Sequence, residues 1–184
     1  MTRLMVLAGP TAVGKGTIVK RLVERFDDVW VSVSATTREP RPGEEDGREY
    51  FFVSEAEFTR MVDAGEFLEW ATVHGSHRYG TPRRAVEERL ATGVPVILEI
   101  DLAGARQVRE AMPEALFVFV MPPSWEALLE RLEGRGTERA DERERRLATA
   151  RDEMAASEEF DAVVVNGDLD VAVTQVNALL RGGE

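Results

Sequence analysis

The stretch Gly9-Pro10-Thr11-Ala12-Val13-Gly14-Lys15 decides the fold that we expect for this chain. It matches the pattern G-x-x-x-x-G-K and lies between an apolar run, Leu4 to Ala8, and an amphipathic pattern, Thr17 to Phe26. Glycines let the backbone curl so that successive N–H groups point at phosphate oxygens, and the following helix N-terminus adds positive potential. Because Lys15 brings a mobile positive charge, the stretch predicts a loop that binds a nucleoside triphosphate.

One position departs from the general pattern of such loops. Gly16 follows Lys15, where most of these loops have a Ser or Thr hydroxyl that binds Mg²⁺. This variant, continued by Thr17, resembles the loops of nucleoside monophosphate kinases, in which phosphates and waters hold most of the metal. We therefore expect Mg²⁺ to arrive with ATP, Thr17 to contact a phosphate, and no protein side chain to be assigned as a metal ligand. Glu99 and Asp101 end a later apolar run and are typical of residues that support a metal or a substrate.

Apolar runs alternate with helical patterns along the chain. Runs rich in Val, Ile and Leu are typical of buried parallel strands, and their alternation with helices predicts an α/β fold. The predicted strands are Leu4 to Ala8, Trp30 to Val33, Val94 to Ile100, Leu116 to Met121 and Ala162 to Val165. The predicted helices are Thr17 to Phe26, Leu102 to Met112, Trp125 to Leu132 and Leu169 to Leu180.

Two stretches interrupt this alternation. The first, from Ser34 to about Gly93, contains a Pro/Gly-rich loop, a helix opened by Ser54 and a strand-like run, Phe67 to Val73, and it indicates an inserted lobe. The second, Glu133 to Arg146, is almost wholly polar and is typical of a solvated helix face or loop. We expect one domain over 1–184, with its core at about 1–33, 94–132 and 147–184.

Composition excludes several classes of function. The 184 residues are 43% hydrophobic, contain no cysteine and carry a net charge of −11, which argues against disulfides, thiolate chemistry and general nucleic-acid binding. No leader-like or membrane-spanning run is present, so we expect a cytoplasmic protein. Lys15 and Lys20 are the only lysines, and arginines gather in 38–48 and 131–151. Arginine grips phosphate oxygens in pairs, although compositional bias explains the overall count equally well.

The segment SATTREPRPGEEDGREYFF (residues 34–52) closely resembles the signature of the guanylate kinases. The resemblance covers essentially the whole chain in family order. It continues through 65–69, 79–81, 99–105, 122–124, 131–137 and 165–166. It implies a P-loop kinase fold, with helices on both faces of a parallel sheet, a GMP-binding lobe at about 34–93 and an arginine-rich lid at about 133–146.

The resemblance also implies which side chains bind GMP. Its phosphate would be held by Arg38, Arg41, Tyr50 and Tyr79, and its guanine would be faced by Ser34, Glu69, Thr81 and Asp101. The second assignment is chemically sensible, because guanine presents two adjacent donors, N1–H and the 2-amino group, that one carboxylate can accept. Adenine lacks that edge, and a site built around hydrogen bonds rejects a ligand that leaves buried polar groups unpaired.

Transfer of the γ-phosphate of Mg·ATP to GMP or dGMP, giving ADP and GDP or dGDP, is the implied reaction. Phosphoryl transfer needs in-line positioning and positive charge around the moving group, and the ionised GMP phosphate needs no general base. Within the family the lid arginines match Arg131, Arg135, Arg146 and Arg151. Lys15, Arg41, Arg135 and Arg146 are the implied catalytic residues, and Asn166 matches a position that touches adenine.

Two other functions compete with this interpretation. Related kinases of this fold phosphorylate a sugar phosphate, and guanylate-kinase-like adaptor modules bind peptides without chemistry. The retained guanine-facing set argues against the first and the intact phosphate loop against the second. Taken singly, Glu69, Arg41 and the two tyrosines would be ordinary surface or core residues. His74 and His77 offer no metal site, and we expect a monomer or weak homo-oligomer with small-molecule substrates.

Overall fold

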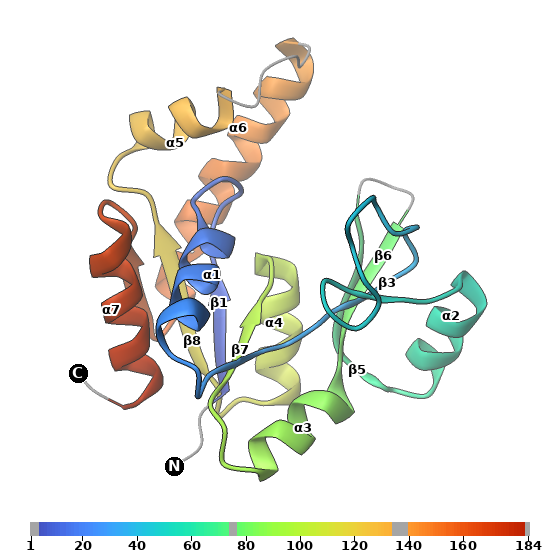
Figure 1. Ribbon diagram of the computed structural model, residues 1–184. Coiled ribbons are helices and arrows are strands. Elements are labelled where there is room, and N and C mark those ends of the chain that lie inside the picture. The colour runs from blue at the N-terminus through green and yellow to red at the C-terminus, as the bar shows by residue number, and fades with distance from the viewer. Residues whose placement is uncertain (1–3, 74–76, 134–139, 183–184) are drawn as a thin grey trace.

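The computed structural model describes residues 4–73, 77–133 and 140–182, with the backbone alone at 73, 133 and 140–146. Within these residues, five parallel strands form a central sheet in the order β2-β7-β1-β8-β9 (Figure 1). The strands are β1 (Leu4–Ala8), β2 (Trp30–Val31), β7 (Val96–Glu99), β8 (Leu116–Met121) and β9 (Ala162–Val165). This arrangement confirms the predicted α/β fold.

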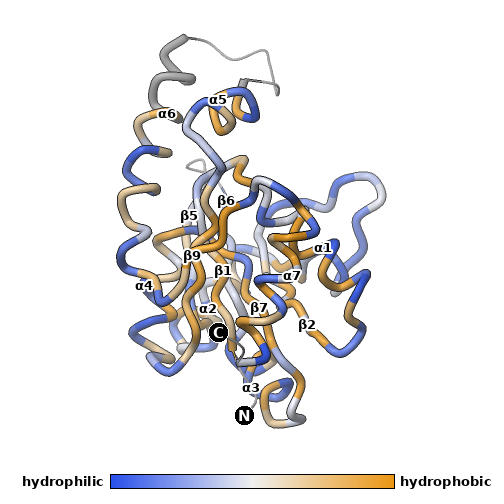
Figure 2. Tube along the Cα trace, turned by 90° about the vertical axis from the view of Figure 1, so that its left-hand side faces the viewer, coloured by the Kyte–Doolittle hydropathy of each residue, from blue (hydrophilic) through white to orange (hydrophobic). Residues whose placement is uncertain are grey.

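Helices cover both faces of the central sheet. Alternate residues of β1 point to opposite sides, so that Met5 packs in the cluster with α1 and α7, whereas Val6 packs in the cluster with α3 and α4. Figure 2 shows the hydrophobic strands running through the middle of the molecule. The helices of the core are α1 (Lys15–Arg25), α3 (Arg83–Ala91), α4 (Leu102–Ala111), α5 (Trp125–Glu133), α6 (Ala140–Ala155) and α7 (Leu169–Leu180), and a 3₁₀ turn, η1 (Ala156–Glu159), follows α6.

A second sheet builds the inserted lobe. In the described residues its order is β4-β3-β6-β5, with β5 and β6 antiparallel. Its elements are β3 (Ala35–Thr36), β4 (Phe51–Phe52), α2 (Glu55–Asp63), β5 (Phe67–Val73) and β6 (His77–Pro82). The lobe has a small core of its own around Phe58, and Ser54 Oγ accepts the Glu57 N–H at 3.1 Å, which confirms the predicted helix start.

Two predicted boundaries differ from the packing. The sequence predicts that the lobe extends to about residue 93 and so includes α3. Val86 of α3 instead packs with Leu98 in the central core, so the lobe ends nearer Pro82. The polar stretch that ends at Arg146 is helical from Ala140 onward, and α6 continues to Ala155. Of the two structures expected for this stretch, a solvated helix face or a loop, its described part is therefore the helix, in keeping with the helix propensity of Ala, Arg and Glu.

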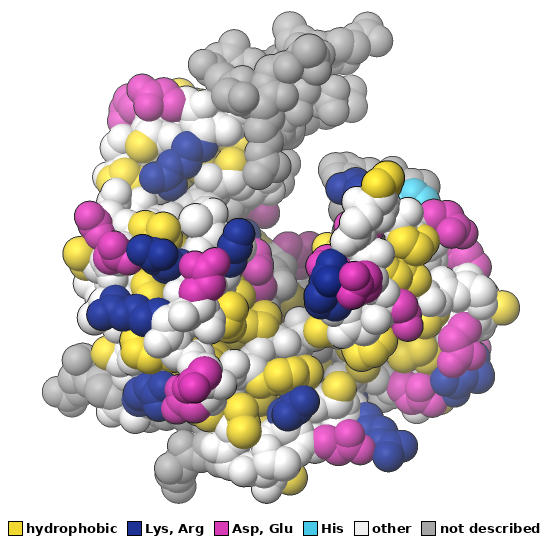
Figure 3. All heavy atoms as spheres, viewed as in Figure 1, with side chains coloured by type: hydrophobic (Ala, Val, Ile, Leu, Met, Phe, Trp, Pro, Cys, Tyr) yellow, Lys and Arg dark blue, Asp and Glu magenta, His cyan; other side chains and the backbone are white. Residues whose placement is uncertain are grey.

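In the described part of the chain, no helix is both long and apolar enough to cross a membrane. The lobe joins the core where β5 packs on α4, and a cleft opens between the lobe and the side of the molecule where α5 and α6 rise above the carboxyl ends of the central strands (Figures 1 and 3). In a parallel sheet this carboxyl edge is where ligands bind. The fold therefore indicates that the cleft is the candidate binding site.

Candidate active site

The loop between β1 and α1 has the backbone geometry of a phosphate cradle. Gly9 has φ +150° and Gly14 has φ +101°, and a Cβ on Gly9 would lie 2.4 Å from the Val120 carbonyl oxygen. Ala12 also adopts a left-handed conformation, with φ +66°, which strains a residue other than glycine. Helix α1 begins at Lys15 and has no side-chain cap, so its first N–H groups are available to an anion.

Lys15 lies folded against this loop. Its Nζ donates to the Gly9 carbonyl at 2.6 Å and to the Pro10 carbonyl at 3.4 Å. Burial lowers the pKa of Lys15, while the neighbouring carboxylates of Glu99 and Glu153 oppose the shift. The ammonium group therefore lies against the loop, next to the expected phosphate-binding position.

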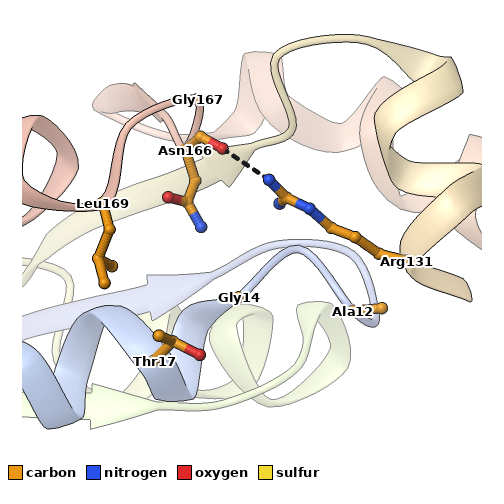
Figure 4. Close-up of a pocket in the computed structure, with 7 residues that line it drawn as sticks. All are labelled: Ala12, Gly14, Thr17, Arg131, Asn166, Gly167 and Leu169. Carbon is orange, nitrogen blue, oxygen red and sulfur yellow. Dashed lines mark hydrogen bonds between the residues drawn. The ribbon is translucent and has the colours of Figure 1, made fainter. Parts of the chain in front are cut away.

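A cavity beside the loop is lined by seven residues (Figure 4). They are Ala12, Gly14, Thr17, Arg131, Asn166, Gly167 and Leu169. The Asn166 amide donates to the Val13 carbonyl at 2.9 Å, and Arg131 donates to the same carbonyl at 3.0 Å and to the Asn166 carbonyl at 3.1 Å. Asn166 therefore borders the cavity and also ties the loop to the end of β9.

A cationic and aromatic cluster lies across the cleft, on the lobe. Glu44 accepts from the Arg38 guanidinium at 2.9 Å and from the Arg41 backbone N–H at 2.7 Å. The Arg38 guanidinium lies 5.4 Å from the centre of the Tyr50 ring, and the Tyr50 and Tyr79 rings are 5.7 Å apart. Glu44 raises the pKa of Arg38, and burial raises the pKa of Tyr50. All four residues predicted to hold the GMP phosphate thus share one loop and the adjacent strand, with the Arg41 side chain exposed.

Glu69 lies buried among polar groups at the junction of lobe and core. The Thr81 hydroxyl donates to its Oε1 at 2.6 Å, and only 6% of Glu69 is exposed. Burial raises the pKa of Glu69 to about 7, helped by the charge of Asp101 and opposed by the Thr81 hydrogen bond. Asp101 caps α4 by accepting the Gly104 N–H at 2.7 Å, and Ser34 is half-buried beside β3, where its carbonyl accepts the Phe51 N–H.

Comparison with known proteins identifies the family. The family model "Guanylate kinase" matches residues 1–182. The chain belongs to the guanylate kinase family. It is 59% identical over 179 residues to a guanylate kinase of Frankia casuarinae, covering 97% of each chain. It is 56% identical over 181 residues to one of Rhodococcus jostii, covering 98% of this chain and 87% of the relative.

A solved structure of the family has the same fold. The crystal structure of guanylate kinase from Anaplasma phagocytophilum matches with a TM-score of 0.77 and 35% identity, over 98% of this chain and 85% of that one. The expected family is therefore confirmed over the length of the chain. The roles of individual residues remain predictions.

The segment that is expected to form a lid is described in part. Arg135 lies outside the described residues, and at Arg146 the structure describes the helical backbone of α6 alone. Arg131 binds the phosphate loop as above, and Arg151 lies 5.1 Å from the Trp125 ring centre. One residue that the sequence reasoning missed is Glu153 of α6, whose Oε2 accepts the Thr11 N–H of the loop at 3.3 Å. Nothing in its polar surroundings distinguished this carboxylate from others on the helix.

Single oxygen donors for a metal lie beside the loop. Within residues 4–73, 77–133 and 140–182, no group of three or more His, Asp or Glu side chains could hold a metal ion. Glu99 is close by, since a Cβ on Gly16 would lie 3.3 Å from its Oε1, and Thr17 faces the adjoining cavity. Partial loss of water around Glu99 raises its pKa, although its side chain still reaches solvent.

Proposed function

We propose that this chain transfers the γ-phosphate of ATP to GMP, giving ADP and GDP. The observation that carries the proposal is the buried carboxylate of Glu69, which accepts a hydrogen bond from the Thr81 hydroxyl. An ionised carboxylate can accept both N1–H and the 2-amino group of guanine. Adenine would leave that carboxylate buried and unpaired, so AMP is disfavoured as the acceptor.

ATP binds at the phosphate loop. Backbone N–H groups of the loop and of the first turn of α1 receive its β- and γ-phosphates, and Lys15 leaves the Gly9 carbonyl to contact them. The base of ATP occupies the cavity bordered by Thr17, Asn166 and Leu169. The base is expected to be bound loosely, so that the phosphates supply most of the affinity for ATP.

The GMP phosphate binds to Arg38, Arg41, Tyr50 and Tyr79. Because Glu44 now pairs with Arg38, the incoming phosphate dianion adds to or replaces that carboxylate as the partner of the guanidinium. An α-phosphate oxygen of GMP attacks the γ-phosphorus in line, and the bond to the ADP oxygen breaks as the new P–O bond forms. Arg135 and Arg146 add positive charge around the moving group when the lid closes.

Mg²⁺ fits this donor set as a companion of ATP. It prefers oxygen ligands, keeps several waters and commonly takes one or two carboxylates, which agrees with Glu99 and Thr17 beside the loop. When bound, the ion neutralises charge on the phosphates. We propose that the reaction takes place in the cytoplasm.

Two rival functions receive less support from the geometry. A kinase for sugar phosphates has no use for a buried Glu69 paired with Thr81 and flanked by Asp101. A peptide-binding module needs neither the strained loop conformation of Ala12 nor a lysine aimed into it. The guanine-facing and phosphate-facing features favour the nucleotide kinase.

Chromatography of products tests the proposal. With Mg·ATP and GMP, the purified protein should form ADP and GDP in equal amounts, and ADP formation should require the acceptor. AMP, CMP and UMP should give little product, and dGMP should serve in place of GMP. ADP release without GDP, or equal turnover of every acceptor, would contradict the proposal.

A further inference from the structure

Gly104, in the first turn of α4, borders the Glu69 carboxylate. A Cβ on Gly104 would lie 2.8 Å from Glu69 Oε2 and 3.3 Å from Asp101 Oδ1. Real Cβ atoms almost never approach another heavy atom to less than 3.0 Å. Any other residue at this position would therefore have to displace the Glu69 carboxylate or α4.

The opposite side of the carboxylate is also occupied. Thr81 Oγ1 lies 2.6 Å from Oε1 of Glu69, while Oε2 is the oxygen that faces Gly104. Both Thr81 and Gly104 are buried, Thr81 completely so. The carboxylate thus fits between a hydroxyl on β6 and a backbone position on α4 that has no side chain.

The strand that carries Glu69 cannot easily move away from α4. One turn further along this helix, the Gln107 side chain binds Trp70 of β5 at two points, accepting its N–H at 3.1 Å and donating to its carbonyl at 3.0 Å. Because Trp70 follows Glu69 directly, these two bonds hold the backbone beside the carboxylate. A methyl group on Gly104 would consequently act on the side chain rather than separate the two elements.

A β-bulge aims Glu69 at this gap. The register of β5 against β6 shifts between Phe67, which faces Pro82, and Glu69, which faces Thr81, so Leu68 is the extra residue. Without a bulge, Leu68 and Glu69 would point to opposite faces of the sheet. Instead Leu68 packs in the cluster with the α4 residue Ala105, and Glu69 lies against Gly104 of the same helix.

We propose that Gly104 is a specificity-determining residue for the nucleotide base. Its missing side chain leaves the space in which the Glu69 carboxylate faces the guanine edge, and Gln107 positions the strand that carries it. This inference rests on the proposed GMP kinase activity. Gly104 itself touches no substrate, and its effect is transmitted through Glu69.

The test is the variant Gly104→Ala, assayed by steady-state kinetics with each substrate varied. We expect KM for GMP to rise roughly 10- to 100-fold, as for a lost hydrogen bond to a charged group, and the preference for GMP over AMP to fall by a similar factor. KM for ATP should stay unchanged. Ala103→Gly, an exposed change in the same turn, is the control and should leave all three quantities unchanged. An unchanged KM for GMP in Gly104→Ala overturns the proposal.

Glu69→Asp provides the second test, because its shorter side chain withdraws the carboxylate from Gly104. The cost of Gly104→Ala in KM should be much smaller in the Glu69→Asp background than in the natural protein. If the fold-changes in KM for GMP caused by the two single substitutions simply multiply in the double variant, Gly104 acts independently of Glu69 and the proposal is overturned. If Gly104→Ala alone does not fold, the double variant should fold, because the shorter aspartate side chain relieves the close contact. A double variant that also fails to fold would show that the added methyl group clashes with the backbone, and this would overturn the proposal.

The unsubstituted protein separates this inference from the proposed function. If it does not phosphorylate GMP, the proposed function fails. If the unsubstituted protein phosphorylates GMP with a strong preference over AMP, and Gly104→Ala has the same KM for GMP and the same preference, only the role of Gly104 is refuted.

Discussion

The hydroxyl of Thr81 donates a 2.6 Å hydrogen bond to the carboxylate of Glu69, and both side chains are buried where β5 and β6 meet α4. Removal of water favours the neutral acid, whereas the Thr81 hydroxyl and a bound guanine favour the ionised carboxylate. The resulting pKa of about 7 means that the free protein holds this group near the middle of its titration at neutral pH. Guanine recognition and local stability are therefore linked at one residue.

The affinity for GMP should depend on pH through Glu69. Only the ionised carboxylate accepts both guanine donors, and the pKa of this group in the free protein is about 7. We expect KM for GMP to rise about tenfold for each pH unit below that value, while KM for ATP changes little over the same interval. Initial rates between pH 5.5 and 8.5 check this. The GMP phosphate itself titrates at about pH 6, so the part of the pH dependence that disappears in Glu69→Gln, at a raised KM, is the part that belongs to Glu69. An unaltered profile in that variant would exclude Glu69.

Removing the charge of Glu69 should stabilise the fold at high pH. The folded protein holds the proton more tightly than the unfolded chain between pH 4.5 and about 7, so the free energy of unfolding falls as pH rises through that interval. The shift corresponds to roughly 3 kcal/mol, and burial of the new amide offsets part of the gain. We expect Glu69→Gln to be about 1–2 kcal/mol more stable than the natural protein at pH 8, and to lose that advantage near pH 4.5.

Urea unfolding at the two pH values measures this difference. Glu110→Gln, which changes an exposed carboxyl on α4, is the control and should change the free energy of unfolding very little. If Glu69→Gln were less stable than the natural protein at pH 8, the ionised carboxylate would be a net stabilising group and its raised pKa would be refuted.

Lys15 is expected to be essential for turnover and dispensable for folding. Its ammonium group is bound only to loop carbonyls of Gly9 and Pro10 among the hydrogen bonds of the described residues, and charge on the transferring phosphates requires it. Lys15→Ala should lower kcat by about 10²- to 10³-fold with an unchanged circular-dichroism spectrum. Lys20→Ala, the same substitution at an exposed site of α1, should retain full activity; equal losses in both variants would indicate a nonspecific effect of removing lysine.

Substitution of Asn166 tests which of two roles this residue has, support of the phosphate loop or contact with the base of ATP. Its amide donates to the Val13 carbonyl at 2.9 Å, and removal of a buried hydrogen bond costs about 1 kcal/mol. Asn166→Ala should therefore lower Tm by a few degrees and raise KM for ATP, with KM for GMP unchanged. A raised KM for ATP at an unchanged Tm would instead assign Asn166 to base contact alone.

Much of the core could be predicted from the sequence because its strands are continuous apolar runs with abrupt polar ends. The predicted limits of β1, β8, β9 and α7 agree with the structure. The start of α1 lies two residues earlier than predicted, at Lys15 rather than Thr17, since the left-handed Gly14 begins the helix directly. Strand β7 begins at Val96, after Pro95, which lacks the N–H that a ladder requires.

The lobe and the acceptor site were less predictable because they depend on contacts between distant segments. Strand β6 reads His-Arg-Tyr-Gly-Thr-Pro and shows no hydrophobic alternation, so its pairing with β3 and β5 decides its conformation. Glu69 beside Trp70 resembles a surface carboxylate in isolation. Its burial results from the bulge at Leu68, the hydroxyl of Thr81 and the gap at Gly104, and none of these is a local property of the sequence.

The ratio of kcat/KM for GMP to kcat/KM for AMP, measured in one assay with saturating Mg·ATP at pH 8, tests most directly whether a buried carboxylate selects guanine. At this pH Glu69 is ionised, and rejection of an acceptor that leaves it unpaired predicts a ratio of about 10⁴ or more. Glu69→Gln should lower that ratio by at least about a hundredfold. A ratio below about ten in the natural protein, or one that Glu69→Gln leaves unchanged, would contradict the assignment of Glu69 as the residue that selects guanine.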